Sequence, residues 1–427
     1  MYGGIMKNWF EEARFGMFIH FGIYSCIGRG EWVRSNEQLS IEDYQPYVDR
    51  FDPYLYDPVK WAKLAKEAGM KYAVMTAKHH DGYCMFDTKT TNYKADRDYI
   101  RAYIDAFRNE GIRVGIYYSL VDWHHDDYPH YHDKIHPMRN NESWKDYPHQ
   151  FDHYLSYMHE QVREICSNYG KIDLMWLDYS YDDMAGEKWQ ATKLVKMIKE
   201  LQPDIILNNR LEVSGEGFGS VITDHPSPYA GDFVSPEQII PPEGITKLDG
   251  SPVLWEACIT MNENWGYHLH DHQFKKPQTI IRKLVECVSK GGNMILNIGP
   301  DGNGEIPEQS VEILREIGKW MKYNSRSIHN CGKAGKPKPE NGRITRNGNK
   351  YYYHIEEMGI GGIPLYGFNK KNIASIKLLI DGTYLKVMDY WTVNNYPDIV
   401  FIEFKNRTEL PDIIDTVVEI EVKEVEN

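Results

Sequence analysis

The chain has 427 residues, of which 41% are hydrophobic and 26% charged, so its composition is that of a globular protein rather than a disordered one. Its formal net charge is −13 and it contains no basic run, which argues against nucleic acid and anionic membrane surfaces as partners. No apolar stretch approaches the roughly 18–20 residues that a membrane-spanning helix needs.

The first residues and the cysteines bear on where the protein works. The N-terminal segment MYGGIMKNWFEEARFG has neither the basic start nor the apolar centre of a secretion signal. Six cysteines are scattered along the chain without a CxxC pair, which is typical of reduced thiols. We therefore expect a cytoplasmic protein, and the sequence is compatible with an oligomer.

Short apolar runs alternate with amphipathic segments over the first three quarters of the chain. Candidate strands cover residues 14–22, 72–80, 112–119, 172–180, 204–210, 220–224, 253–258 and 293–299. Helical patterns cover residues 57–69, 99–111, 154–170, 191–203 and 276–292. Strand–helix alternation is typical of an α/β protein with a parallel sheet, and eight strands favour a closed (β/α)₈ TIM-like barrel. A doubly wound open sheet is the alternative, but the sequence has neither a GxGxxG after the first strand nor a P-loop.

The pattern changes after about residue 330. The segment GKAGKPKPENGRITRNGNK is rich in Gly, Pro and Lys, as linkers and exposed loops are. Short alternating segments follow, among them YYYHIEEM, SIKLLIDG and DIVFIEFK, and they predict a small antiparallel β-sandwich. We therefore assign residues 1–332 to a (β/α)₈-like barrel and residues 333–427 to a C-terminal β-sandwich.

Polar side chains stand at the predicted C-terminal tips of many barrel strands. In a (β/α)₈ barrel these tips meet at one end, and that end carries the active site. The residues at the tips are His20, His79, His80, Tyr117, Asp178, Arg210, Glu256 and Asn297.

Five stretches carry most of this polar chemistry: FGMFIHFGIYSCIGRGEW, KHHDGYCMFDTKTTNY, GIYYSLVDWHHDDYPHYHD, DLMWLDYS and GDFVSPEQ. Together with WEAC, WGY and SKGGNMILNIGPDGNGEIP, they resemble the α-L-fucosidases of glycoside hydrolase family 29. The resemblance runs in order from Trp9 to about Asn324. It implies an exo-glycosidase that removes terminal α-L-fucose from oligosaccharides or glycoconjugates, needs no metal or cofactor, and can also transfer the fucosyl group to acceptors.

The resemblance implies a retaining double displacement, with Asp178 as the nucleophile that forms a fucosyl-enzyme intermediate. A retaining glycosidase needs two carboxyl groups about 5–5.5 Å apart, one nucleophile and one acid/base. Because Asp178 must be ionised to attack, we expect a nearby cation or hydrogen bonds to hold its pKa down.

The acid/base is implied by resemblance at Glu237 of DFVSPEQ. Its main rival is Glu256 of LWEAC, which we expect at a strand tip, and Glu212 and Glu216 are weaker candidates. The alternative interpretation of Glu237 is a solvated loop carboxylate.

The resemblance also implies a set of fucose-binding residues. Imidazole and charged donors suit the sugar hydroxyls, and aromatic rings suit the methyl group and the apolar ring face. The set comprises His20, Glu31, Trp32, His79, His80, Tyr117, Arg210 and Trp265. Taken one at a time, each histidine could be a structural residue and each tryptophan a core aromatic.

Two other functional classes compete with a fucosidase. A metal-dependent barrel hydrolase would use His20, His79 and His80 as ligands, but such enzymes typically carry an HxH pair on the first strand, and FIHFG has one histidine. A non-catalytic sugar-binding barrel would lack the Asp178 carboxylate. The His- and Asp-rich loop 123–133 suits transition metals in composition, but we expect it to form a wall for the sugar units beyond fucose.

Overall fold

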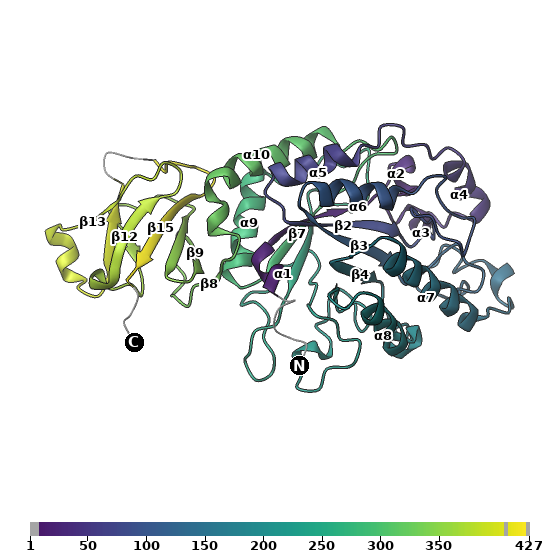
Figure 1. Ribbon diagram of the computed structural model, residues 1–427. Helices are drawn as coiled ribbons and strands as arrows, with labels where there is room; N and C mark the ends of the chain where they lie inside the picture. Colours follow the sequence, from purple (N-terminus) through teal and green to yellow (C-terminus); the bar gives the residue numbers. More distant parts are fainter. Residues whose placement is uncertain (1–7, 405–408, 424–427) are drawn as a thin grey trace.

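The computed structural model describes residues 8–404 and 409–423. It consists of a barrel whose strands are surrounded by helices, and a second, all-β unit beside it (Figure 1). No helix within these two ranges is both long and apolar enough to cross a membrane.

A parallel sheet forms the barrel, with the strand order β5-β4-β3-β2-β1-β7-β6. The strands are β1 (Phe15–Ile19), β2 (Tyr72–Lys78), β3 (Arg113–Ser119), β4 (Leu174–Asp178), β5 (Ile206–Leu207), β6 (Glu256–Thr260) and β7 (Asn293–Ile298). All neighbouring pairs are parallel, as the strand–helix alternation predicted.

The gap between the edge strands β5 and β6 is closed by residues 233–237. Isolated parallel bridges join Phe233 to Asn208, Val234 to Trp255, and Glu237 to Cys258. This segment therefore takes the eighth position of the barrel, although Pro236 has no N–H to donate and the pairing stays irregular.

The predicted strand at 220–224 is wrong. Residues Ser220–Ile222 form a 3₁₀ turn, η3, in a loop that precedes the closing segment. The apolar, β-branched pattern of SVITD favoured a strand, but no sheet edge is available to it, because residues 233–237 occupy the position beside β5.

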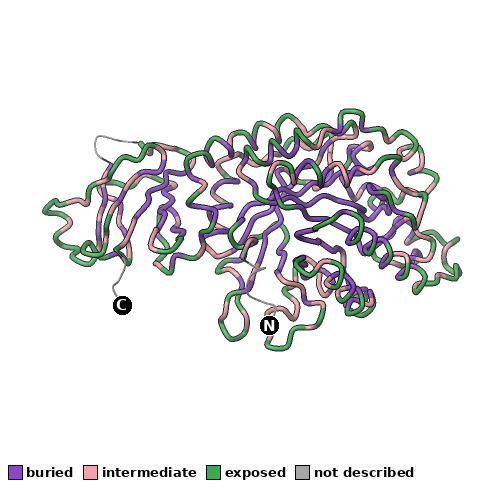
Figure 2. Tube along the Cα trace, in the orientation of Figure 1, coloured by how far each residue is buried: buried purple, intermediate pink, exposed green. Residues whose placement is uncertain are grey.

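Helices cover the outside of the sheet, and Figure 2 shows buried strands within a shell whose outer faces are exposed. The long ones are α5 (Pro58–Glu67), α6 (Tyr99–Asn109), α7 (Phe151–Asn168), α8 (Ala191–Leu201), α9 (Pro277–Ser289) and α10 (Glu308–Asn324). The first five lie where the sequence predicted helices, and α10 was missed. Shorter helices are α1 (Asn8–Ala13), α2 (Tyr24–Ile27), α3 (Val33–Asn36) and α4 (Ile41–Val48).

Capping explains where two of these helices begin and end. The Asp57 carboxylate accepts hydrogen bonds from the first turn of α5, and Pro58 stands at the first helical position, where no N–H is needed. The Asp98 side chain caps α6 in the same way. Gly69 and Gly111 follow these helices with φ of +84° and +76°, the left-handed conformation that reverses the chain after a helix.

Period-two alternation along each strand separates the barrel interior from the helix-facing core. On β4, Leu174 and Trp176 point into the barrel, whereas Met175 and Leu177 pack beneath the helices. Asp178 continues the inward series at the C-terminal end of the strand. The alternation therefore places its carboxylate at the mouth of the barrel.

The C-terminal unit is a β-sandwich, as predicted. One antiparallel sheet has the order β12-β15-β10-β9-β8 and the other β11-β14-β13, and side chains of both form one core. Its strands are β8 (Gly332–Lys333), β9 (Gly342–Asn347), β10 (Lys350–Ile355), β11 (Ile363–Leu365), β12 (Ile373–Leu378), β13 (Lys386–Val387), β14 (Val400–Glu403) and β15 (Thr416–Val422). Arg282 of α9 and Trp320 of α10 donate hydrogen bonds to backbone carbonyls of this unit, which ties it to the barrel.

Candidate active site

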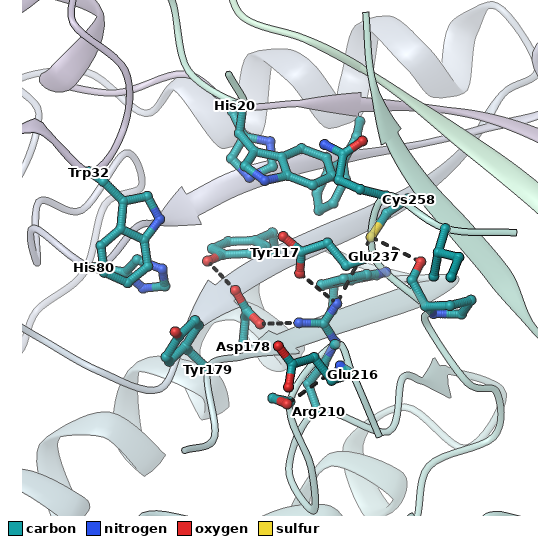
Figure 3. A pocket seen from close by; sticks show the side chains of 18 of the residues that line it. His20, Trp32, His80, Tyr117, Asp178, Tyr179, Arg210, Glu216, Glu237 and Cys258 are labelled. Carbon is teal, nitrogen blue, oxygen red and sulfur yellow. Dashed lines mark hydrogen bonds and ion pairs between the residues drawn. The ribbon is translucent and has the colours of Figure 1, made fainter. Parts of the chain in front are cut away.

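A pocket of about 740 Å³ opens at the C-terminal end of the barrel strands. Figure 3 shows its side chains converging from several strand ends. Of the residues predicted from sequence, the lining includes His20, Trp32, His79, His80, Tyr117, Asp178, Arg210, Glu237 and Trp265. Residues from eight separate segments of the chain thus meet at one cavity.

Asp178 is the last residue of β4 and lies in the pocket with 8% of its surface exposed. The Tyr117 hydroxyl donates to its Oδ2 at 2.9 Å, and the Arg210 Nη1 lies 3.3 Å from its Oδ1. Both carboxylate oxygens are therefore held in one orientation by groups that stabilise the anion.

Burial nevertheless raises the pKa of Asp178 to about 6, and the negative charge of Glu237 adds to the rise. Arg210 and the Tyr117 hydroxyl act in the opposite direction. The predicted cation is thus present, but the expectation that it holds the pKa down is wrong, because desolvation outweighs it.

Arg210 is the cation that joins the two carboxylates. Its Nη2 lies 3.0 Å from Glu237 Oε2, while Nη1 faces Asp178. The guanidinium is buried, stands 4.9 Å from the ring centre of Trp176, and donates through Nε to the Ser235 hydroxyl at 3.0 Å. These contacts fix the orientation of the guanidinium, so both carboxylates bind to one rigid group.

Glu237 comes from the closing segment, at the position that bridges to Cys258 of β6. Its side chain is 39% exposed, in contrast to the buried Asp178, and it reaches both the pocket and Arg210. Figure 3 shows its carboxylate and that of Asp178 joined by dashed lines to different nitrogens of the guanidinium. The structure thus places Glu237 in the pocket rather than on a detached loop.

Gly215 presses against this carboxylate pair from the loop before the closing segment. A Cβ at this position would lie 2.6 Å from Arg210 Nη2 and 2.8 Å from Glu237 Oε2, and the backbone is not left-handed there. We expect Gly215→Ala to displace Glu237. If Glu237 acts as the sequence resemblance implies, kcat/KM on aryl α-L-fucosides should fall by about 100-fold, since a misplacement of about 1 Å has that effect on a catalytic group. Steady-state kinetics measure the loss.

Gly359→Ala is the matched control for this substitution, because a Cβ at Gly359 meets no atom within 4 Å. It should leave the activity unchanged. Equal activity of Gly215→Ala and wild type would contradict the close fit of the loop over Glu237.

Glu256 is not at a strand tip, contrary to the sequence expectation. It is the first residue of β6, at the opposite end of the barrel, where it pairs with the first residue of β7. Its carboxylate accepts hydrogen bonds from Tyr72 and Trp176 and is fully buried, and burial raises its pKa to about 7. Glu256 does not line the pocket, and its hydrogen bonds to Tyr72 and Trp176 lie at the opposite end of the barrel, its floor.

The three predicted histidines follow β1 and β2 and are buried. Burial lowers the pKa of His20 to about 3 and those of His79 and His80 well below the usual value, so all three are neutral at physiological pH. A neutral imidazole has one donor and one acceptor nitrogen. His20 Nδ1 pairs with Asn297 at 2.7 Å and His80 Nδ1 with Ser119 at 2.7 Å, whereas His79 Nδ1 has no partner among the described residues.

Of the two remaining predicted binding residues, one lines the pocket and the other lies outside its lining. Trp265 lines the pocket, and its ring centre lies 5.2 Å from that of His20. Glu31 is buried outside the lining, where its Oε2 accepts a hydrogen bond from Gly266 N at 2.8 Å. Glu31 therefore holds the loop that carries Trp265.

Several lining residues had no role in the sequence analysis. Phe18, Trp176 and Cys258 belong to the inward series of their strands, and Tyr179 follows Asp178. Phe18 and Trp176 could have been found, because each stands two residues before a predicted site residue on the same face of its strand. The rest of the rim comes from two loops, residues 214–218 and 236–242, where no periodic pattern exists.

The metal-dependent alternative finds no ligand set among the described residues. Across residues 8–404 and 409–423, no group of three or more His, Cys, Asp or Glu side chains is placed to hold a metal ion. No residue of the His/Asp-rich loop 123–133 lines the pocket, so its part in a wall for sugar units beyond fucose stays a prediction. Two of its histidines stack on aromatic rings, His124 on Tyr93 and His130 on Trp144.

Comparison with known proteins identifies the relatives of this pocket and fold. The sequence profile of the family described as alpha-L-fucosidase matches residues 4–326. The alpha-L-fucosidase isoenzyme 1 of Paenibacillus thiaminolyticus is 52% identical in a solved structure, with a TM-score of 0.96 over 99% of this chain and 100% of that one. The alpha-L-fucosidase of Dictyostelium discoideum is 27% identical over 357 residues, which are 76% of this chain and 71% of that protein.

A third relative was solved as a trapped covalent intermediate. This alpha-L-fucosidase GH29 from Bacteroides thetaiotaomicron is 27% identical, with a TM-score of 0.82 over 97% of this chain and 95% of that one. Its structure was obtained with 2-fluoro-fucosyl fluoride and a Glu-to-Gln mutant.

Proposed function

The chain belongs to the α-L-fucosidase family of glycoside hydrolases, and we propose that it removes terminal α-L-fucose from oligosaccharides or glycoconjugates by a retaining double displacement. In this proposal Asp178 is the nucleophile and Glu237 the acid/base. Transfer of the fucosyl group to an acceptor other than water is the second outcome of the same intermediate.

One observation carries the proposal: Asp178 and Glu237 bind the two terminal nitrogens of the same buried guanidinium. A retaining glycosidase needs its two carboxyl groups close enough to work on one anomeric carbon. The shared support of Arg210 provides this closeness and holds one oxygen of each acid.

The two carboxylates differ in how far they are buried, and this difference suits their two proposed roles. Asp178 is enclosed and doubly hydrogen-bonded, which suits a nucleophile that must keep one orientation while it attacks. Glu237 is more exposed, which suits a group that first protonates the departing oxygen and then deprotonates a water or acceptor entering from solvent.

The neutral histidines suit a neutral, hydroxyl-rich sugar. Each imidazole can donate to one hydroxyl or accept from another, and all three rings line the pocket. Trp32, Trp176 and Trp265 supply the apolar surfaces that the methyl group and ring face need.

The direct test is hydrolysis of 4-nitrophenyl α-L-fucoside followed by proton NMR. We expect the first-formed sugar to be the α-anomer, because two inversions at carbon 1 restore the starting configuration. First formation of the β-anomer, or no release of nitrophenol and no fucose from fucosylated oligosaccharides, would contradict the proposal.

The pH profile tests the environment of Asp178. Since only its anion attacks, kcat/KM should fall as the pH drops below about 6, the pKa of the buried carboxyl. Tyr117→Phe removes a hydrogen bond that favours the anion, so the acidic limb should move to higher pH. We expect a shift of about one pH unit, because a hydrogen bond to a charged group is worth about 1.5–3 kcal/mol and one pH unit about 1.4 kcal/mol.

Tyr118→Phe is the control for that shift, because the neighbouring hydroxyl donates to Gln161 outside the pocket. Its acidic limb should coincide with that of wild type. An unmoved limb in Tyr117→Phe would mean that Asp178 does not set the acidic side of the profile.

A further inference from the structure

Two large apolar side chains stand exposed at the mouth of the pocket, on loops that meet beside Glu237. Phe218 is 40% exposed and Ile239 is 58% exposed, and both line the cavity that holds Asp178. Single exposed apolar residues are common on protein surfaces. A pair at the rim of one cavity, brought there by two separate loops, needs a further explanation.

The backbone before Ile239 is held in an unusual conformation. Gln238 has a φ of +57°, in the left-handed region that non-glycine residues avoid. Its backbone N–H donates to the Cys258 carbonyl at 3.0 Å, and its side-chain amide donates to the Thr260 hydroxyl at 2.9 Å. Such conformations persist where the surroundings impose them and are frequent at functional sites. The turn directs the chain so that Ile239 reaches the rim.

Phe218 is fixed by hydrogen bonds at both ends of its loop. The Glu212 carboxylate accepts from the backbone N–H and hydroxyl of Ser220 at 2.7 and 2.9 Å. The buried Asn209 amide donates to the carbonyls of Gly217 and Phe218 at 3.1 and 3.3 Å. The loop also passes over Arg210 and Glu237 at Gly215. Phe218 is therefore held in place beside the acid/base before any ligand arrives.

The position beside Glu237 decides what these residues would contact. An acid/base must reach the glycosidic oxygen, so the group attached through that oxygen, the aglycone, lies on the side of Glu237. Aryl rings and the apolar faces of pyranose rings pack well on such side chains. The exposed carboxylate of Glu216, in the same loop and pocket, favours a neutral aglycone over an acidic one.

We propose that Phe218 and Ile239 form the aglycone-binding site and select neutral leaving groups that have an apolar face. This inference rests on the proposed function. It adds the part of the substrate beyond fucose and assigns contact with that part to the two rim loops.

Leaving-group dependence provides the test. We expect Phe218→Ala and Ile239→Ala each to lower kcat/KM on 4-nitrophenyl α-L-fucoside by about tenfold, because each removes a large apolar contact with the aryl group. On α-L-fucosyl fluoride, whose leaving group has no ring to bind, both variants should stay within about twofold of wild type. Phe218→Leu should recover part of the loss on the aryl substrate.

Leu248→Ala is the matched control, because Leu248 is 74% exposed but lies outside the pocket lining. It should behave as wild type on both substrates. Equal losses on the two substrates would overturn the inference and show an effect on catalysis or folding, and unchanged kinetics on both would overturn it as well. A wild type that cleaves neither fucoside would instead refute the proposed function itself.

Discussion

Asp178→Ala is expected to lower kcat/KM on aryl α-L-fucosides by about 10³- to 10⁵-fold, the usual range for loss of a catalytic nucleophile. The variant keeps Arg210 and Glu237 paired with each other, so the acid/base still protonates the leaving group. What is lost is the carboxylate that attacks the anomeric carbon. Steady-state kinetics with a single preparation of each protein measure the effect.

Added azide separates the role of Asp178 from a general loss of structure. The space left by the side chain admits the small anion, which should attack the substrate directly and give β-L-fucosyl azide after one inversion. The melting temperature should stay close to that of wild type. The folded state raises the pKa of Asp178 above its ordinary value, so its anion lowers stability at neutral pH and its removal relieves that cost. Formation of the α-azide by this variant would contradict the nucleophile assignment.

Glu237→Ala should depend strongly on the leaving group. We expect kcat/KM to fall by about 10²- to 10⁴-fold on fucosyl oligosaccharides, which need a proton on the departing oxygen. The loss should be much smaller on α-L-fucosyl fluoride, which needs little acid assistance. Azide should speed turnover by attacking the fucosyl-enzyme and should give α-L-fucosyl azide, because Asp178 has already inverted the centre once.

Three other glutamates are the comparison set for this result. Glu256→Gln should keep its activity within a few-fold, since that carboxylate lies on the barrel floor, and any effect should show in the melting temperature instead. Glu212→Gln should loosen its loop without changing the azide response. Glu216 lines the pocket, so azide rescue of Glu216→Gln rather than Glu237→Ala would move the acid/base to Glu216.

The strand pattern predicted the position of Asp178 well. Leu174, Trp176 and Asp178 alternate with outward-facing residues, and a polar residue at the end of an inward series must face the barrel mouth. The prediction from strand tips also brought His20 and Tyr117 to the pocket, where both line the cavity. Local sequence suffices here because regular pairing with both neighbouring strands determines which way each side chain points.

The acid/base region could not be predicted from local pattern. The closing segment contains Pro236 and makes only isolated bridges, so it does not read as a strand. The neighbouring SVITD run does resemble a strand in its sequence, although it forms a turn. Glu256 was misplaced because the start of β6 depends on its pairing with β7, which the residues of VLWEAC do not specify. Resemblance rather than periodicity identified Glu237.

The rim loops depend on contacts that join distant parts of the chain. Gly215 lies over Arg210 and Glu237 because no side chain intervenes, and the Asn209 amide holds the loop from the end of β5. Neither contact leaves a periodic signal in the sequence. The same holds for Glu31, whose bond to Gly266 spans 235 residues and whose role is to hold the Trp265 loop.

Trapping the intermediate tests the central claim most directly. Incubation with 2-fluoro-fucosyl fluoride should slow breakdown of the fucosyl-enzyme, so that mass spectrometry of the intact protein shows one added 2-fluorofucosyl group. Peptide mapping should place that group on Asp178, and Asp178→Ala should remain unlabelled. A label on another residue, or an active protein that accumulates no adduct while it releases fluoride, would contradict Asp178 as the nucleophile.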